Sequence, residues 1–486
     1  MTQNETIDER YRALLARDAR FDGIFFVGVA TTGIYCRPIC RVKTPGAAVC
    51  HFFASAGLAE AAGFRPCLRC RPELAPYALQ QNLAHQIWQK IAAGALNEQN
   101  LEEFATTIGL SSRQLRRVVQ QEFGLSPLAL AQSQRLLFAK KLIQETTLNL
   151  TQIAFAAGFG SIRRFNASFL AHYRMSPSSI RRKSETQAAG FCLGLAYRPP
   201  LAWDEMLRYL KGRAIPGLEC IDLEKSTYTR LIELDQGGTA WYSLQHLPEQ
   251  GQCSLQLSAN LLDHHSKALM PLLLRIRKQF DLEANPLCIA EHLQHDPRLA
   301  PSIAQTPGLR VPSCYDPYEL GVRAILGQQV SVAGATTLSG RLIQKFGRKV
   351  EGPRAELNHH FPKPHTLATA SIEDLAGLGL PKSRARTLQA FAQFCAEGRL
   401  QKLAGLDLPA TITELCTLPG IGAWTAHYIA MRGLGFPNAF PAGDLGLQKA
   451  YAKPGSARCT EKQLQEASLA WAPWRAYAAL HLWESL

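Results

Sequence analysis

The sequence contains no apolar run that approaches the ~18 residues needed to span a membrane. Its first residues, MTQNETIDERYRALLARD, are polar and carry both signs of charge, so we expect no secretory signal. Low-complexity tracts and fixed-period repeats are also missing. These absences predict a soluble, cytoplasmic protein without a membrane partner. At ~100–200 residues per domain, its 486 residues predict about three or four domains.

The 13 cysteines are odd in number, which argues against a disulfide framework in that compartment. Four of them form two close pairs, Cys36-x3-Cys40 and Cys67-x2-Cys70. Thiolate pairs spaced two to four residues apart are the usual ligands of tetrahedral zinc. The spacing predicts one zinc ion per chain, with a purely structural role as the alternative. We expect Cys50 to be a small core residue and not a ligand.

Acidic residues are scarce in the first third of the chain. Residues 1–183 hold 23 lysines and arginines against 12 acidic residues, whereas residues 184–486 hold 30 against 27. A basic segment is usually just a solvated surface, but this asymmetry favours a nucleic-acid partner.

Composition and periodicity divide the chain into four parts. Residues 1–78 carry the cysteine pairs, and residues 79–183 show helical spacing with Ser, Gly and Pro breaks. A short polar linker is expected at 184–190. Residues 191–305 carry strand-like pieces such as YTRLIEL and CSLQLSA, and residues 311–486 again predict helices.

The cysteine region contains FDGIFFVGVATTGIYCRPICR followed by AAGFRPCLRCRP. It resembles the N-terminal domain of the Ada adaptive-response family. The resemblance implies that Cys36 is both a zinc ligand and the acceptor of a methyl group from a DNA methylphosphotriester. A zinc-held thiolate is a competent nucleophile, and Arg37 and Arg41 are expected to add positive potential. The family's DNA-contacting positions correspond to Thr32, Arg41, Lys43 and Arg65, with Lys43 replacing the usual arginine.

Two passages, at 101–127 and 150–177, each predict a helix, a glycine turn, a serine cap and a basic helix. A basic helix that follows a tight turn can fill a major groove. A helical bundle with charged faces is the alternative. The pair resembles the AraC-type DNA-binding domain through the signature Ala156, Gly158, Phe159, Phe165, Phe169, Tyr173 and Pro177. Joined to the Ada-like region, it implies a methylation-responsive activator that binds promoter DNA and RNA polymerase.

In the last part, LPGIGAWTA places Gly420 and Gly422 in a turn before a helix, and FPAGDLGLQKA follows with Asp444. Outward amides at such a turn bind a phosphate without reading sequence. Together with the runs at 197–219 and 318–332, these motifs resemble the helix-hairpin-helix, Gly-Pro, Asp superfamily of base-excision glycosylases, of the AlkA (DNA-3-methyladenine glycosylase II) type. The match implies that Asp444 is the catalytic carboxylate, although an Asp that only caps a helix is the alternative.

The same match places Trp424, Tyr428 and Trp483 in the base pocket, where electron-rich rings suit a cationic alkylated purine. Without the match, three aromatic residues on an apolar face would be interpreted as core residues. Trp424 stands where lyases of the superfamily carry lysine, so no Schiff base is expected. Gln329 takes the place of the leucine that often wedges into DNA in relatives.

These features predict a mainly α multidomain protein with α+β parts. The expected domains are a small zinc-bound α/β domain at 1–78, a tandem helix-turn-helix at 79–183, an AlkA-type N-terminal α+β domain at 191–305 and an all-α helix-hairpin-helix domain at 311–486. The predicted function is that of a methyl-activated transcription activator, fused to a monofunctional glycosylase that excises bases such as 3-methyladenine from double-stranded DNA.

We expect the protein to be a monomer. One alternative is a regulator with an inert glycosylase half, and another is a repair enzyme whose front half only tethers it to DNA. No Pro-Cys-His-Arg motif occurs, so O6-alkylguanine repair is not expected.

Overall fold

The computed structural model describes residues 3–72, 75, 83–181, 191–234, 238–259, 261, 266–403, 406–452, 455 and 457–486. The expected linker at 184–190 lies outside these residues. None of the helices in these ranges has the length and apolar character to cross a membrane. The chain divides into two compact units. One comprises Met1–Pro199, Leu247–Leu274 and Leu282–Asn285, and the other comprises Pro200–His246, Arg275–Asp281 and Pro286–Leu486.

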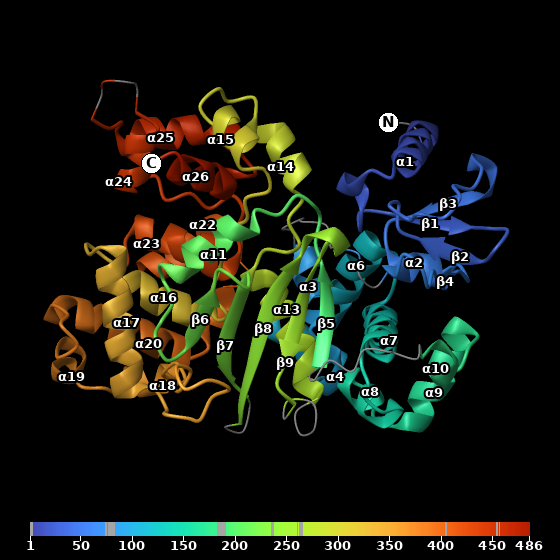
Figure 1. The fold of residues 1–486 in the computed structure, drawn as a ribbon, viewed down its shortest axis with the longest axis horizontal. Helices are drawn as coiled ribbons and strands as arrows, with labels where there is room; N and C mark the ends of the chain where they lie inside the picture. Colours follow the sequence, from blue (N-terminus) through green and yellow to red (C-terminus); the bar gives the residue numbers. More distant parts are fainter. Residues whose placement is uncertain are drawn as a thin grey trace. The chain divides into compact units, whose positions relative to one another are not determined.

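The first unit begins with a four-stranded sheet in the order β3-β1-β2-β4 (Figure 1). Strand β1 pairs antiparallel with β2 and β3, and β2 pairs parallel with β4. Neighbouring residues of β1 face opposite sides, so Phe26 packs against α2 while Val27 packs against α1. The elements of this part are α1 (Gln3–Ala16), β1 (Phe26–Val29), β2 (Ile34–Cys36), β3 (Cys50–Phe53), α2 (Ala56–Ala61) and β4 (Arg65–Pro66).

Two similar helix pairs follow, joined by the long helix α7. Ser111 caps α6 and Ser161 caps α9, and each serine oxygen accepts a backbone N–H three residues later. Gly109 and Gly158 take left-handed φ values of +72° and +80° in the turns that precede these caps. The tandem helix-turn-helix predicted from the sequence is therefore confirmed. Its helices are α3 (Leu83–Ala92), α4 (Ala95–Glu98), α5 (Leu101–Thr107), α6 (Ser112–Phe123), α7 (Pro127–Glu145), α8 (Leu150–Ala156), α9 (Ile162–Tyr173) and α10 (Pro177–Ile180).

Each unit also contains antiparallel strands of the predicted α+β region. In the first unit, β5 (Phe191–Ala196) pairs with β9 (Gln252–Leu257). In the second, β7 (Thr227–Glu233) pairs with both β6 (Glu219–Asp222) and β8 (Thr239–Leu247). The two strand-like pieces named from the sequence are β7 and β9, each displaced by one residue at its start.

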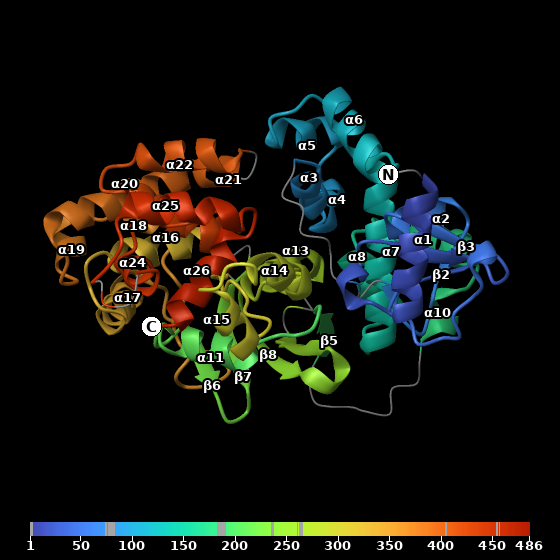
Figure 2. The ribbon, with the colours of Figure 1, turned by 90° about the horizontal axis from the view of Figure 1, so that it is seen from above.

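The second unit is otherwise helical. Apolar residues of α16, α20 and α22 share one buried core, which includes Val322, Phe391 and Leu415, and Figure 2 shows these helices grouped together. The helices that follow the strands are α14 (Pro286–Leu293), α15 (Ala300–Gln305), α16 (Pro317–Leu326), α17 (Val332–Phe346), α18 (Pro364–Ala368), α19 (Ile372–Ala376), α20 (Lys382–Ala396), α21 (Arg399–Lys402), α22 (Leu408–Cys416), α23 (Ala423–Tyr428), α24 (Leu445–Ala450), α25 (Glu461–Ser468) and α26 (Arg475–Glu484). The helix α11 (Trp203–Lys211) also belongs to this unit, and α13 (Leu269–Gln279) belongs to it from Arg275 onward. The predicted fold class, mainly α with α+β parts, is confirmed.

Candidate metal centre, DNA-binding surfaces and base pocket

The two predicted cysteine pairs converge at one end of the small sheet. The sulfur atoms of Cys36, Cys40, Cys67 and Cys70 all lie within 4.8 Å of one another, and three of these residues are buried. Backbone N–H groups donate to two of the sulfurs, from Arg37 to Cys70 and from Arg69 to Cys67, each at 3.4 Å. Four converging thiols with backbone donors fit a tetrahedral zinc ion. Cys50 lies outside the cluster, and its thiol donates to the carbonyl of Gly46.

Arg37, which was expected to add positive potential near the thiolates, carries its charge inside the fold. Its guanidinium is buried and ion-paired with Asp22, to which its Nε donates at 2.8 Å, while Nη1 donates to the Cys70 carbonyl at 3.2 Å. The Arg37–Asp22 ion pair lies beside the cysteine cluster, so Asp22 offsets part of the positive potential expected from Arg37. Arg41 is exposed, and its contribution to the potential remains a prediction.

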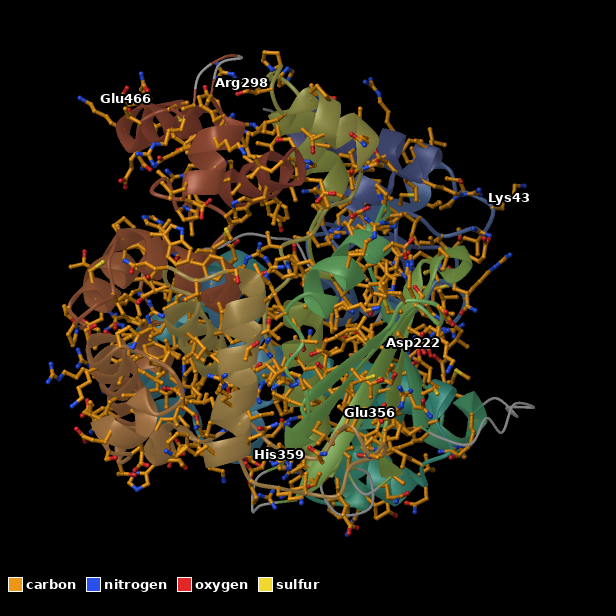
Figure 3. The ribbon with its side chains drawn as sticks, turned by 60° about the vertical axis from the view of Figure 1, so that its left-hand side comes forward. Lys43, Asp222, Arg298, Glu356, His359 and Glu466 are labelled. Carbon is orange, nitrogen blue, oxygen red and sulfur yellow. The ribbon has the colours of Figure 1, made fainter. Side chains whose placement is uncertain are left out.

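The residues predicted to contact DNA in this region differ in exposure. Thr32, Arg41 and Lys43 are exposed, and Figure 3 shows Lys43 pointing away from the fold. Arg65 is half-buried and its Nη1 lies 4.0 Å from the Met175 sulfur. The Arg65 backbone N–H donates to the Gly33 carbonyl at 2.8 Å, which brings Arg65 beside the turn that carries Thr32.

The basic helices of the two helix-turn-helix pairs expose their arginines. Leu115 and Val119 of α6 are buried, as are Phe165, Phe169 and Tyr173 of α9, so one face of each helix belongs to a core. The arginines lie on the other face and are exposed at 113, 116, 117, 163 and 164. This arrangement leaves both basic faces available to a phosphate backbone.

The predicted hairpin joins α22 to α23. Gly420 has a φ of +78°, and a Cβ there would lie 2.0 Å from the Thr387 hydroxyl oxygen, so only glycine fits. Gly422 is exposed at the start of α23, and no side chain caps the helix there. The first amides of α23 are thus free of a capping side chain, as an anion site requires.

Asp444 is held by three N–H donors from three parts of the chain. Its Oδ2 accepts from Trp424 Nε1 at 2.9 Å, and its Oδ1 accepts from Trp483 Nε1 at 3.0 Å and from the Leu447 backbone at 2.9 Å. Asp444 therefore caps α24, as the alternative interpretation had it, and also lines a cavity. Two of the three aromatics assigned to the pocket act as hydrogen-bond donors that fix this carboxylate.

The cavity that Asp444 lines has a volume of about 660 Å³. Trp424 and Tyr428 stack on its wall with ring centroids 5.3 Å apart, and the hydroxyl of Tyr428 lies 3.2 Å from that of Tyr209. Burial and the neighbouring Tyr209 raise the pKa of Tyr428, so it remains a neutral phenol at physiological pH. A cavity of this size with stacked rings can enclose a nucleobase.

The predicted wedge residue lies in the turn between α16 and α17. Gln329 is exposed and has a left-handed φ of +56°, a backbone conformation that is uncommon for a residue other than glycine. Its neighbour Gln328 donates to the Gly420 carbonyl and to the Thr425 hydroxyl, each at 3.0 Å. The turn and the hairpin are therefore tied to each other.

Sequence reasoning missed four residues of this site: Tyr209, Arg213, Gln328 and Arg432. The signal for Arg432 was present, because residues 424, 428 and 432 follow one another at four-residue spacing on one helical face. Tyr209 and Arg213 lie within the run at 197–219 that carried the resemblance, but nothing local marks them as pocket residues.

Four family models match consecutive parts of the chain. They are the metal binding domain of Ada at residues 9–73, a helix-turn-helix domain at 104–183, the AlkA N-terminal domain at 192–316 and the HhH-GPD superfamily base excision DNA repair protein at 322–475. Fold, sites and family matches together define a DNA-binding protein that joins a cysteine metal centre and a tandem helix-turn-helix to a helix-hairpin-helix glycosylase.

Relatives join the same parts in one chain. This chain is 38% identical to the probable bifunctional transcriptional activator/DNA repair enzyme AlkA of Mycobacterium tuberculosis, over 99% of this chain and 97% of that protein. It is 34% identical to DNA-3-methyladenine glycosylase 2 of Escherichia coli, over 60% of this chain and 95% of that protein. The chain belongs to the family of AlkA-type bifunctional transcriptional activator/DNA repair enzymes.

A solved structure shares the glycosylase fold. The 3-methyladenine DNA-glycosylase from Archaeoglobus fulgidus matches with a TM-score of 0.52 at 20% identity, over 60% of this chain and 97% of that one. At this identity the likeness shows the fold alone.

Proposed function

We propose that the second unit excises alkylated bases such as 3-methyladenine from double-stranded DNA. The observation that carries this proposal is the carboxylate of Asp444, fixed by two indole N–H groups at the wall of a cavity that a nucleobase fits. The name of the Escherichia coli relative supports the substrate class. Gln329 and the amides beside Gly420 and Gly422 are the proposed DNA contacts, and Trp424, Tyr428 and Trp483 line the proposed base pocket.

The proposed reaction breaks the bond between the sugar C1′ and the base nitrogen, whose electron pair leaves with the base. Positive charge builds on the sugar, and Asp444 stabilises it and orients the water that adds to C1′. That water then releases a proton to solvent. Trp424 and Trp483 keep the carboxylate in one orientation, so little reorganisation is needed as charge develops. Because Trp424 stands where a lyase needs lysine, the product is an intact abasic site.

We further propose that the first unit holds one zinc ion per chain through Cys36, Cys40, Cys67 and Cys70. When bound, zinc keeps the thiols deprotonated at neutral pH. The Cys36 sulfur then attacks the methyl carbon of a DNA methylphosphotriester, and the electron pair of the broken C–O bond returns to the phosphate oxygen. Thr32, Arg41, Lys43 and Arg65 are the proposed phosphate contacts. Lys43 offers a point charge where an arginine would offer a two-pronged donor.

Methyl transfer is expected to add one methyl group to Cys36, once and without turnover. Mass spectrometry of peptides after incubation with methylated DNA measures this directly, and Cys36→Ser should abolish it. Methylation removes one negative charge from the thiolate cluster, which lessens repulsion from DNA phosphates and should tighten promoter binding. Equal promoter affinity of the methylated and unmethylated protein would contradict the proposed switch.

We propose that the arginines of α6 and α9 bind the promoter. We also propose that the chain is a monomer and that RNA polymerase is a further partner. Arg163→Gln should reduce the slope of log affinity against log salt by about 1, the value for one lost phosphate contact. Fluorescence anisotropy with promoter DNA over a salt series measures the slope. The matched control is Lys349→Gln, an exposed cation outside the helix-turn-helix pairs. An unchanged slope for Arg163→Gln would remove α9 from the interface.

We propose domain limits of 1–78, 79–183, 191–305 and 311–486. The family match at 9–73 lies within the first of these domains, whereas the AlkA N-terminal match runs to residue 316, beyond the proposed limit at 305.

A further inference from the structure

Arg432 is a buried cation in the wall of the base cavity. Only 2% of its surface is exposed, and it lies in the π-helical segment Ile429–Leu434 that continues α23. Its Nη1 donates to the Pro312 carbonyl at 2.9 Å, and its Nε has no hydrogen-bond partner among the described residues. No carboxylate forms an ion pair with it in that part of the chain. Burying a charge without an opposite charge is costly, and a residue of this kind in a cavity wall is a candidate for a role toward a ligand.

Aromatic rings compensate the charge of Arg432. Its guanidinium carbon lies 4.5 Å from the ring centroid of Tyr209, 5.5 Å from that of Tyr428 and 5.4 Å from that of Trp483. The guanidinium carbon of Arg213 also lies 3.9 Å from the Tyr209 ring centroid. The rings of Tyr209, Tyr428 and Trp483 are therefore already engaged by the protein's own guanidinium groups, and among the described residues Trp424 is the pocket ring without such a contact.

None of the carboxylates that line the cavity forms an ion pair with Arg432 among the described residues. Asp444 accepts its three N–H groups, Glu219 is paired with Arg230 and Arg323, and Glu205 is paired with Arg208. Glu484, the fourth, is an exposed residue at the cavity edge. Asp444 keeps its negative charge on the sugar-facing part of the wall, and the charge of Arg432 is left without a carboxylate partner of its own in the described part of the chain.

We propose that Arg432 is a specificity-determining residue, which shifts excision from cationic alkylated bases toward neutral damaged purines. This inference rests on the proposed glycosylase function. When a neutral purine leaves, the electron pair of the broken C1′–N9 bond makes the base an anion until it takes a proton from solvent. A fixed cation in a cavity of low dielectric constant stabilises that developing charge. A cationic base only becomes neutral as it leaves, and its initial charge is repelled by Arg432.

The test compares wild type with Arg432→Met and Arg432→Lys on two duplexes. One duplex carries a single 7-methylguanine, which is cationic, and the other carries a single hypoxanthine, which is neutral. Single-turnover rates of base release are measured for each. We expect Arg432→Met to lower the ratio of hypoxanthine release to 7-methylguanine release by about tenfold or more, the effect of one charge at short range in a partly shielded site. Arg432→Lys keeps the charge and should restore most of the ratio.

Parallel loss of both activities in Arg432→Met, with the ratio unchanged, would overturn the proposal and make Arg432 a packing residue. A ratio that falls equally in the Lys variant would also overturn it, since charge would then not be the cause. Thermal unfolding identifies a Met variant that fails to fold, in which case Arg432→Gln supplies the uncharged comparison. Failure of the wild-type chain to release either base would instead contradict the proposed glycosylase function.

Discussion

Asp444→Asn is expected to lower the rate of base release from methylated DNA by about two orders of magnitude or more, the size seen when one electrostatic stabiliser of a transition state is removed. The substitution keeps the shape of the side chain and removes the negative charge. It also turns an acceptor into a donor, so one of the indole N–H groups of Trp424 and Trp483 loses its partner. Single-turnover release of 3-methyladenine, followed by chromatography, measures the loss.

DNA binding should persist in Asp444→Asn, because the proposed phosphate contacts come from the hairpin amides and not from the carboxylate. A matched control is Glu461→Gln, an exposed carboxylate at the first position of α25 that does not line the cavity. Its rate should equal that of wild type. Undiminished excision by Asp444→Asn, or strand cleavage without added base, would contradict the mechanism.

Cys67→Ala is expected to release zinc and unfold the front of the first unit. Structural zinc contributes about 10 kcal/mol or more of apparent binding free energy, which exceeds the stability of most small domains. The two strands nearest the cysteines are short, since β2 contains three residues and β4 only two, so they offer few backbone hydrogen bonds to hold the cluster without metal. Metal content by atomic emission and limited proteolysis within residues 9–73 measure the two effects.

Cys50→Ala is the matched control for Cys67→Ala. It removes a thiol from the same region that lies outside the cluster, so zinc and protease resistance should both remain. A Cys67→Ala protein that keeps one equivalent of zinc and resists protease would show that the four cysteines are not the ligand set.

The sequence was most informative where structure follows from short-range spacing. The paired cysteines, the serine caps at 111 and 161 and the glycines of the hairpin each need only a few neighbouring residues to be interpreted. These features occur in the structure at the positions the spacing predicts. Strands β7 and β9 were recognisable for the same reason, because alternation along one strand needs no partner to be visible.

What the sequence could not show was which distant side chains meet. Trp424 and Trp483 lie 20 and 39 residues from Asp444 in the sequence. Only the tertiary fold shows that the indole N–H groups of these two expected pocket residues donate to the Asp444 carboxylate. The Arg37–Asp22 pair has the same origin, since a guanidinium next to a cysteine looks like free charge until its partner is known. Arg432 was hidden because a single arginine on a helix is usually solvated.

We propose that one chain carries two separate alkylation chemistries on two separate sets of residues, and a single experiment distinguishes them. Wild type, Cys36→Ser and Asp444→Asn are each incubated with methylated duplex DNA, and the released base and the methyl group on the protein are quantified in the same sample. We expect both products from wild type, base release alone from Cys36→Ser, and protein methylation alone from Asp444→Asn. A wild-type chain that gives only one product, or either substitution abolishing both, would contradict it.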